Sequence, residues 1–120
     1  PLVYACSGCS SAAQMANHFA LRLDREGLAE MSCIAGVGGG VSALLRVARQ
    51  PRLILALDGC PLHCVHACLK QAGIEATRGV DLSALGVKKL KKRDFSSTEA
   101  ERVWWESILP AIRDMTAHSV

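Results

Sequence analysis

Five of the six cysteines in this 120-residue chain occur at spacings that could place several sulfurs around one ion. Cys6 and Cys9 form a Cys-x-x-Cys pair, Cys33 stands alone, and Cys60 and Cys64 are four residues apart. Four thiolates in a tetrahedron suit Zn²⁺, and the same donors hold iron–sulfur clusters. The cysteines therefore predict a metal site, and their pattern leaves open whether it holds zinc or an iron–sulfur cluster.

The same thiols allow two other uses. Cys6 and Cys9 could form a reversible disulfide, poised by the helix that follows, which would make this a thiol redox or sulfur-handling protein. A bound metal with an open coordination position would instead indicate a metalloenzyme. The residues leave open whether the protein is an enzyme, because the cysteines have no neighbouring general base except Asp58, and an Asp before Gly usually bonds the backbone of a turn.

Three residues near Cys64 are weaker candidates. Cys68 lies a further helical turn along and is expected to be packed as a small buried side chain. His63 and His66 flank Cys64, but on a helix beginning at Pro61 they would point away from the cysteine face. We therefore expect both histidines to face solvent.

Strands alternating with helices must position these residues. Apolar segments predict strands at residues 2–5, 28–34, 53–57 and 74–77, and helical patterns follow at 11–27, 42–49, 61–72 and 97–118. The alternation predicts an α/β fold in three layers, an approximately four-stranded parallel sheet with helices on both faces, like half of a Rossmann or flavodoxin fold. Every strand-to-helix turn of such a sheet emerges at its carboxyl edge. The five candidate cysteines are thereby expected at one edge.

Local signals set the expected helix ends. Ser11 with Gln14 and Thr98 with Glu101 fit capping boxes, and Pro61 suits the first position of a helix. In the last helix, Pro110 should produce a kink. Trp104 and Trp105 point in different helical directions, so one is expected in the core and the other on a contact surface or homodimer seam.

A glycine run precedes the second helix. Bare backbone N–H groups at Gly36, Gly38, Gly39 and Gly40 could bind a small anion together with the helix dipole. No Gly-Lys-Ser/Thr follows, so the run is not a P-loop. A tight turn that approaches the thiols is an equally good interpretation.

Composition narrows the class of protein. Half of the residues are hydrophobic and the formal charge is only +3, which fits one domain over residues 1–120 and does not indicate nucleic acid. The basic run 88–93 has no aromatic neighbours suited to base stacking and is expected to be a solvated loop. No apolar run is long enough to span a membrane and no signal peptide is evident, so the expected location is cytoplasmic.

Four motifs resemble a known family. They are Tyr-Ala-Cys-Ser-Gly-Cys-Ser at 4–10, Met-Ser-Cys-Ile-Ala-Gly-Val-Gly-Gly at 31–39, Asp-Gly-Cys-Pro-Leu-His-Cys at 58–64 and Leu-Gly-Val-Lys-Lys at 85–89. In this order they resemble the DGC-domain family of small prokaryotic proteins, named for its Asp-Gly-Cys core. Members are described as zinc-binding on the strength of their cysteines. The resemblance implies metal ligands among Cys6, Cys9, Cys33, Cys60 and Cys64, and it implies no substrate or pathway. We therefore expect zinc as the metal, with an iron–sulfur cluster as the alternative.

Overall fold

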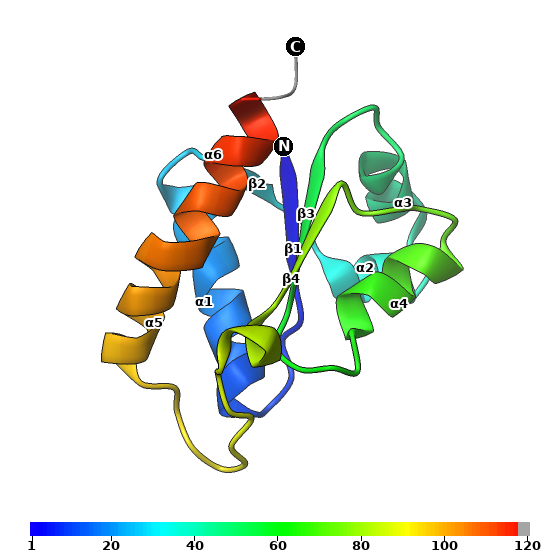
Figure 1. Ribbon diagram of the computed structural model, residues 1–120. Coiled ribbons are helices and arrows are strands. Elements are labelled where there is room, and N and C mark those ends of the chain that lie inside the picture. The colour runs from blue at the N-terminus through cyan, green and yellow to red at the C-terminus, as the bar shows by residue number, and fades with distance from the viewer. Residues whose placement is uncertain (118–120) are drawn as a thin grey trace.

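Four parallel strands form one sheet in the computed structural model, which describes residues 1–117. The strands are β1 (Leu2–Ala5), β2 (Glu30–Met31), β3 (Ile54–Asp58) and β4 (Arg78–Asp81), in the spatial order β2-β1-β3-β4. Helices cover both faces of this sheet (Figure 1). The expected three-layer α/β architecture is therefore confirmed.

The helices divide between the two faces of the sheet. On one face lie α1 (Ser11–Arg25), α5 (Ser97–Val103) and α6 (Leu109–Ala117), and on the other lie α2 (Ile34–Gly38), α3 (Ser42–Ala48) and α4 (Cys64–Gln71). A 3₁₀ turn, η1 (Leu82–Leu85), follows β4, and a π-helical segment, η2 (Trp104–Ile108), joins α5 to α6. Each strand thus ends where a helical element is about to begin.

The alternation of side chains along β1 and β3 produces two hydrophobic cores. Val3 and Ala5 of β1 pack with α1 and the C-terminal helices, whereas Leu2 and Tyr4 pack with α2, α3 and α4. Successive residues of a strand face opposite sides of the sheet, so a strand buried on both sides is apolar throughout. This explains why both strands are continuous apolar runs with every residue buried.

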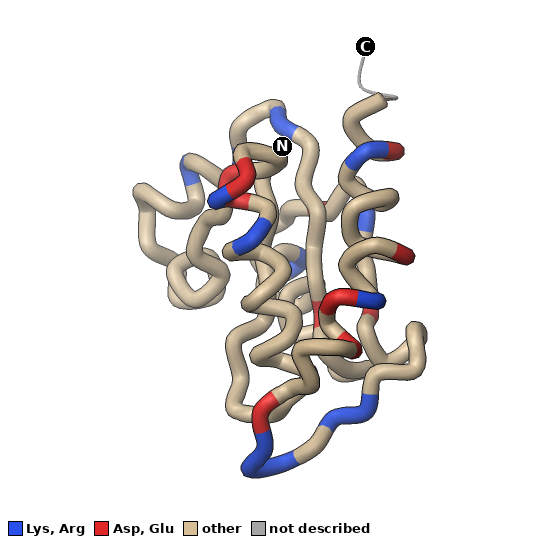
Figure 2. Tube along the Cα trace, turned by 90° about the vertical axis from the view of Figure 1, so that its left-hand side faces the viewer, with Lys and Arg blue, Asp and Glu red and all other residues tan. Residues whose placement is uncertain are grey.

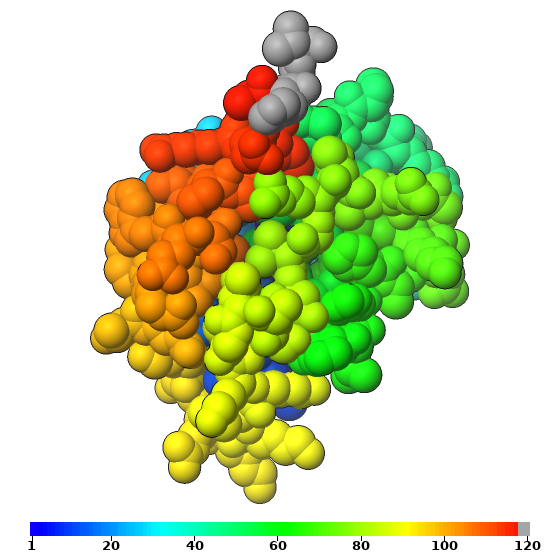
Figure 3. Space-filling model, in the orientation of Figure 1, coloured from blue at the N-terminus to red at the C-terminus, as the bar shows by residue number. Residues whose placement is uncertain are grey.

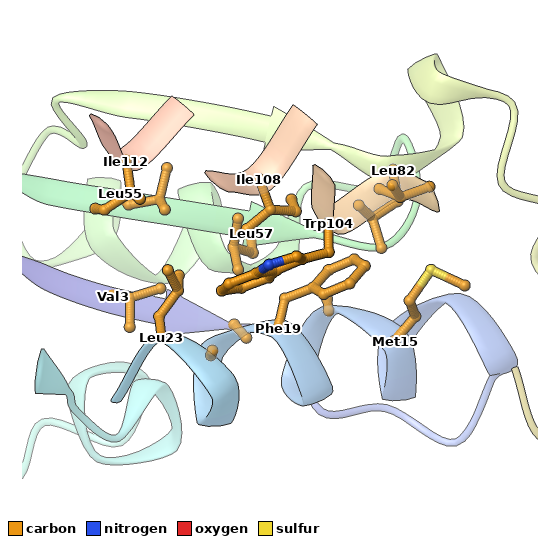
Figure 4. Packing of buried hydrophobic residues seen from close by; sticks show 14 of the residues in the cluster. Val3, Met15, Phe19, Leu23, Leu55, Leu57, Leu82, Trp104, Ile108 and Ile112 are labelled. Carbon is orange, nitrogen blue, oxygen red and sulfur yellow. The ribbon is translucent and has the colours of Figure 1, made fainter. Parts of the chain in front are cut away.

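The larger core is centred on aromatic side chains from distant segments. Trp104 is 1% exposed and its ring lies 6.3 Å from that of Phe19, with Leu57 and Ile108 close by (Figure 4). The Arg22 guanidinium lies 4.1 Å from the Trp104 ring centroid, a cation–π contact that closes this core toward solvent. The other tryptophan, Trp105, is 57% exposed, as expected from its helical direction.

The C-terminal helix widens before Pro110. The Leu109 N–H donates to the Trp104 carbonyl, a hydrogen bond to the fifth residue back, instead of the fourth as in an α-helix. Proline has no N–H, and its ring clashes with the carbonyl four residues earlier. The helix accommodates the expected disturbance at Pro110 as a π-helical turn. Residue 118, the last of the predicted helix 97–118, lies outside the described residues.

Several predicted boundaries are wrong. The segment 28–34 pairs in the sheet only at β2, and residues 36–38 of the glycine run belong to α2 and not to a loop. The fourth strand lies at Arg78–Asp81, because the apolar residues Ile74 and Ala76 pack against the core beneath α4 instead of pairing. The caps of α1 and α5 are Ser10 and Ser96, one and two residues earlier than expected.

The helix after β3 also begins later than predicted. Pro61 is exposed in a turn, and α4 starts at Cys64, following His63 in a left-handed conformation with φ 52°. In consequence Cys60 is not on the helix, and only Cys64 and Cys68 share its surface.

No helix within residues 1–117 combines the length and the apolar character needed to cross a membrane.

The two tryptophans provide a test of the larger core. Replacing Trp104 with Ala should lower the free energy of unfolding by about 3–5 kcal/mol, because it removes a large buried side chain and leaves a cavity. Trp105→Ala, one residue away on the exposed side, should change it by less than about 0.5 kcal/mol. Urea unfolding followed by circular dichroism measures both, and equal losses would contradict the assignment of Trp104 to the core.

Candidate functional site

A pocket of about 670 Å³ opens at the carboxyl edge of the sheet, where the turns after β1 and β3 meet. We call it the cysteine pocket, because it is lined by five of the six cysteines together with small, apolar and basic residues. Its lining consists of Cys6, Ser7, Gly8, Cys9, Ser10, Ala13, Ile34, Ala35, Gly59, Cys60, Leu62, Cys64, Val65, Cys68, Lys89, Lys91 and Lys92. Residues far apart in sequence thus converge at the expected edge.

Four of the five predicted site cysteines line this pocket. Cys6 and Cys9 come from the turn between β1 and α1, Cys60 from the turn between β3 and α4, and Cys64 from the first position of α4. Cys33 directly precedes α2 and lines a neighbouring hollow, which shares Ser7, Ile34 and Ala35 with the cysteine pocket. All six cysteines are free thiols in the structure.

Cys68 was expected to be packed, and it is packed on one side only. Its sulfur would lie 3.0 Å from a Cβ added at Gly38, so α2 and α4 touch at this point only because Gly38 has no side chain. Yet Cys68 is half-buried and also lines the cysteine pocket. Cys68 is therefore the fifth thiol of the pocket, and the sequence pattern does not place it there.

The carboxylate of Asp58, at the end of β3, organises the turn that carries Cys60. Asp58 is 1% exposed, and its Oδ1 accepts a hydrogen bond of 2.9 Å from the backbone N–H of Val65 in the first turn of α4. Its Oδ2 accepts a 2.6 Å bond from Nδ1 of His66. The expected backbone bond of Asp58 is present, and it reaches seven residues along the chain to hold the start of the next helix.

Gly59 brings the same turn against α1. A Cβ at this position would lie 2.7 Å from the carbonyl carbon of Ala12 and 2.8 Å from the backbone nitrogen of Ala13, so only glycine fits without displacing the helix. The Gly59 N–H also donates to the sulfur of Cys6 across 3.1 Å. In the Asp-Gly-Cys sequence, the aspartate therefore connects β3 to α4, the glycine packs against α1, and the cysteine places its thiol in the pocket.

Cys6 differs from the other thiols in its electrostatics. Burial raises the pKa of the Cys6 thiol, and this outweighs the hydrogen bond from Gly59, which lowers it. The nearby charges of Asp58, Cys60 and Cys64 raise the pKa further. A thiol in this environment keeps its proton to higher pH unless a cation replaces that proton.

The two histidines are tied to strand ends. His63 is exposed, as expected, and its Nε2 lies 2.9 Å from Oδ2 of Asp81, a hydrogen bond that raises the pKa of His63. His66 was expected to face solvent but is half-buried, bonded to Asp58, with its ring in the space that a side chain at residue 79 would occupy. The late start of α4 explains this difference, because it places His66 in the first helical turn beside Asp58.

The glycine run has a different geometry from the one predicted. The N–H groups of Gly39 and Gly40 donate to the carbonyls of Ala35 and Val37, within and just after α2. They are therefore engaged by the backbone itself. Anion binding at this run stays a prediction, and it would have to displace these hydrogen bonds.

Basic side chains are the part of the pocket that sequence reasoning missed. Lys89 lies with its Nζ 3.7 Å from the sulfur of Cys60, and Lys91 and Lys92 also line the pocket. The run was expected to be a solvated loop, and its residues are exposed. The position of the run beside the thiols depends on the contact between Leu90 and Ser11, which are 79 residues apart in the chain. A local sequence pattern could not have predicted this contact.

Comparison with known proteins identifies the family. The sequence model of the DGC domain matches residues 2–106. The chain belongs to the DGC domain family. This DGC domain is also 59% identical over 106 residues to the anaerobic and virulence modulator AnvM of Pseudomonas aeruginosa, an alignment that covers 88% of the chain and 81% of AnvM. No solved structure matches the chain.

The close approach of Gly59 to α1 can be tested in this DGC domain by adding one methyl group. Gly59→Ala should lower the free energy of unfolding by about 1–3 kcal/mol, because the new Cβ forces the backbone of Ala12 and Ala13 away from the turn. Gly8→Ala is the matched control in the opposite turn of the pocket, where the added Cβ meets only the Ala13 side chain at 3.5 Å. Thermal unfolding of the two variants measures the difference, and an unperturbed Gly59→Ala protein would contradict the contact.

The accessibility of the thiols predicts an order of alkylation in reduced, chelator-treated protein. Iodoacetamide near neutral pH should modify the exposed residues Cys9, Cys33 and Cys64 before Cys6, which is half-buried and has a raised pKa. As pH rises, the rate at Cys6 should keep increasing beyond the pH at which the rate of a free cysteine in solution levels off, because burial raises the pKa of Cys6. Peptide mass spectrometry at timed intervals measures each site, and early modification of Cys6 would contradict its assigned environment.

Proposed function

We propose that this DGC domain is a metal-binding regulatory protein that holds zinc through Cys6, Cys9, Cys60 and Cys64. The observation that carries the proposal is that these four thiols, from two separate turns, line one pocket at the carboxyl edge of the sheet. Four soft sulfur donors match the usual ligand set of a closed zinc site. A bound zinc ion would supply a fixed positive charge that holds the two turns together.

The thiols suit zinc in type, but their positions would have to change on binding. Among residues 1–117, no group of three or more His, Cys, Asp or Glu side chains is already arranged to hold one ion. Cys9 and Cys64 are both exposed and belong to separate segments that line the pocket, so drawing them together would close it. We therefore propose that metal binding and closure of the pocket are coupled.

A regulatory role fits the pocket better than a catalytic one. No histidine, aspartate or glutamate belongs to the described residues that line it, so it offers no carboxylate or imidazole as a general base. AnvM, the relative from Pseudomonas aeruginosa, is named as a modulator. We extend that kind of role to this chain, and we propose that it acts in the cytoplasm, where thiols stay reduced.

Two alternatives use the same pocket. An iron–sulfur cluster would take the same four thiolates. Thiol redox chemistry would instead join Cys6 and Cys9, which line the pocket from one turn, in a reversible disulfide. The raised pKa of Cys6 disfavours it as the attacking thiolate, which leaves that part to the exposed Cys9.

Elemental analysis of protein purified anaerobically without added metal tests the proposal. We expect about one zinc ion per chain and no visible absorption. Cys9→Ser and Cys64→Ser should each reduce the zinc retained after dialysis against a weak chelator, because each removes one ligand from a different turn. Cys33→Ser, which changes a thiol outside the cysteine pocket, should retain zinc as the unsubstituted protein does.

Three other results would change the proposed metal, its ligands or the function itself. Metal-free, folded protein with all six thiols titrating would overturn the metal function and leave thiol chemistry. Iron with inorganic sulfide would replace zinc with a cluster. Loss of zinc in Cys33→Ser but not in Cys9→Ser would show that the ligand set is wrong.

A further inference from the structure

The basic loop, residues 88–93, is exposed but anchored to the start of α1. Ser11, which is 4% exposed, donates its backbone N–H to the Leu90 carbonyl across 2.9 Å, and its Oγ accepts a 2.9 Å bond from the Leu90 N–H. The same Oγ lies 3.3 Å from the Lys88 carbonyl. A buried residue thus holds the middle of the loop in a fixed register.

With the loop held in this way, its basic side chains lie on two different sides of it. Lys89, Lys91 and Lys92 line the cysteine pocket, whereas Lys88 and Arg93 line a separate hollow beside α5. The loop projects at the lower end of the molecule (Figure 3), and Figure 2 shows basic positions along it. Three cations therefore face the thiols.

Nothing in the lining neutralises these cations. None of the described residues that line the pocket is an Asp or Glu, and the nearest buried acid, Asp58, is already engaged by Val65 and His66. Lys89 makes the closest contact, with its Nζ 3.7 Å from the sulfur of Cys60. A small anion entering the pocket would meet ammonium groups and thiols together, in a volume of about 670 Å³ that suits a small molecule.

From this arrangement we infer that the pocket captures small anionic disulfides, and that Cys60 is the residue they modify. The carboxylates of the disulfide bind Lys91 and Lys92, which brings its S–S bond to the sulfur beside Lys89. This activity uses the same pocket as the proposed metal site but does not require the metal. Cys60 in the modified form could not serve as a zinc ligand, so on the proposed function the reaction would also expel zinc.

The reaction is an ordinary thiol–disulfide exchange. The thiolate of Cys60 attacks one sulfur of the disulfide, the S–S bond of the reagent breaks, and a mixed disulfide forms on Cys60. The other half leaves as a thiolate and takes a proton from solvent. No further oxidant is needed, because the disulfide is the oxidant.

Rates with disulfides of opposite charge test the inference on the reduced 120-residue chain in the presence of a chelator. We expect oxidised glutathione, an anion, to modify Cys60 faster than cystamine, a cation, with a preference that falls as ionic strength rises. The double variant Lys91→Gln/Lys92→Gln removes the two groups that bind the carboxylates and should lose about tenfold of this preference. Lys88→Gln/Arg93→Gln removes two charges from the same loop on its other side and should keep it.

Mass spectrometry locates the adduct, which should be on Cys60 and absent from Cys60→Ser, and circular dichroism confirms that each variant is folded. Equal rates with the two disulfides, equal losses in both double variants, or adducts mainly on Cys9, Cys33 or Cys64 would each overturn the inference. Because the readout is an adduct on metal-free protein, a failure of the zinc proposal would not affect it. A failure here would likewise leave the zinc stoichiometry unchanged.

Discussion

The buried carboxylate of Asp58 fixes where β3 ends and where α4 begins. Its two oxygens accept hydrogen bonds from the backbone of Val65 and the ring of His66, so the turn between them must close over a carboxylate that is shielded from water. Removing that carboxylate would leave a buried N–H without a partner, at a cost of about 1–3 kcal/mol. The placement of Cys60 and Cys64 depends on this closure, because both belong to the turn or to the helix that it starts.

The two turns of the cysteine pocket are joined through α1. Gly59 presses the β3 turn against the first turn of that helix and donates to the Cys6 sulfur, while Ser11 holds the basic loop from the other side. The N-terminal end of α1 thus contacts both the β3 turn and the basic loop, two of the segments that surround the thiols. Gly59 and Ser11, residues with little or no side chain, make these contacts possible where backbones must approach closely. Another glycine, Gly38, lets α2 approach Cys68 of α4 in the same way.

Local sequence patterns correctly predict the elements with continuous apolar runs or a clear helical spacing. They are wrong where a contact with a distant residue determines where an element begins. The strands β1 and β3 and the helix α1 follow from apolar runs and helical spacing. The start of α4 does not follow from such a pattern. Pro61 suits the first position of a helix, but the helix begins later, at Cys64, where the Val65 N–H donates to Asp58. The apolar pattern predicts the fourth strand too early in the chain. Ile74 and Ala76 are apolar because they pack against the core, and the strand that pairs in the sheet follows them. In the site, the thiols could be predicted to lie together because strand-to-helix turns meet at the carboxyl edge of a parallel sheet. The lysines could not, because their position depends on the tertiary contact between Leu90 and Ser11.

Both margins of the sheet are poor templates for a further strand. At one side β2 pairs through only two residues, and at the other β4 is four residues long, carries Arg78 and Asp81 at its ends, and passes directly into a 3₁₀ turn. Short and charged edge strands are a common protection against sheet-to-sheet aggregation. A second copy of this chain would therefore find little free backbone to extend, and self-association would have to use helical surfaces such as the one that displays Trp105.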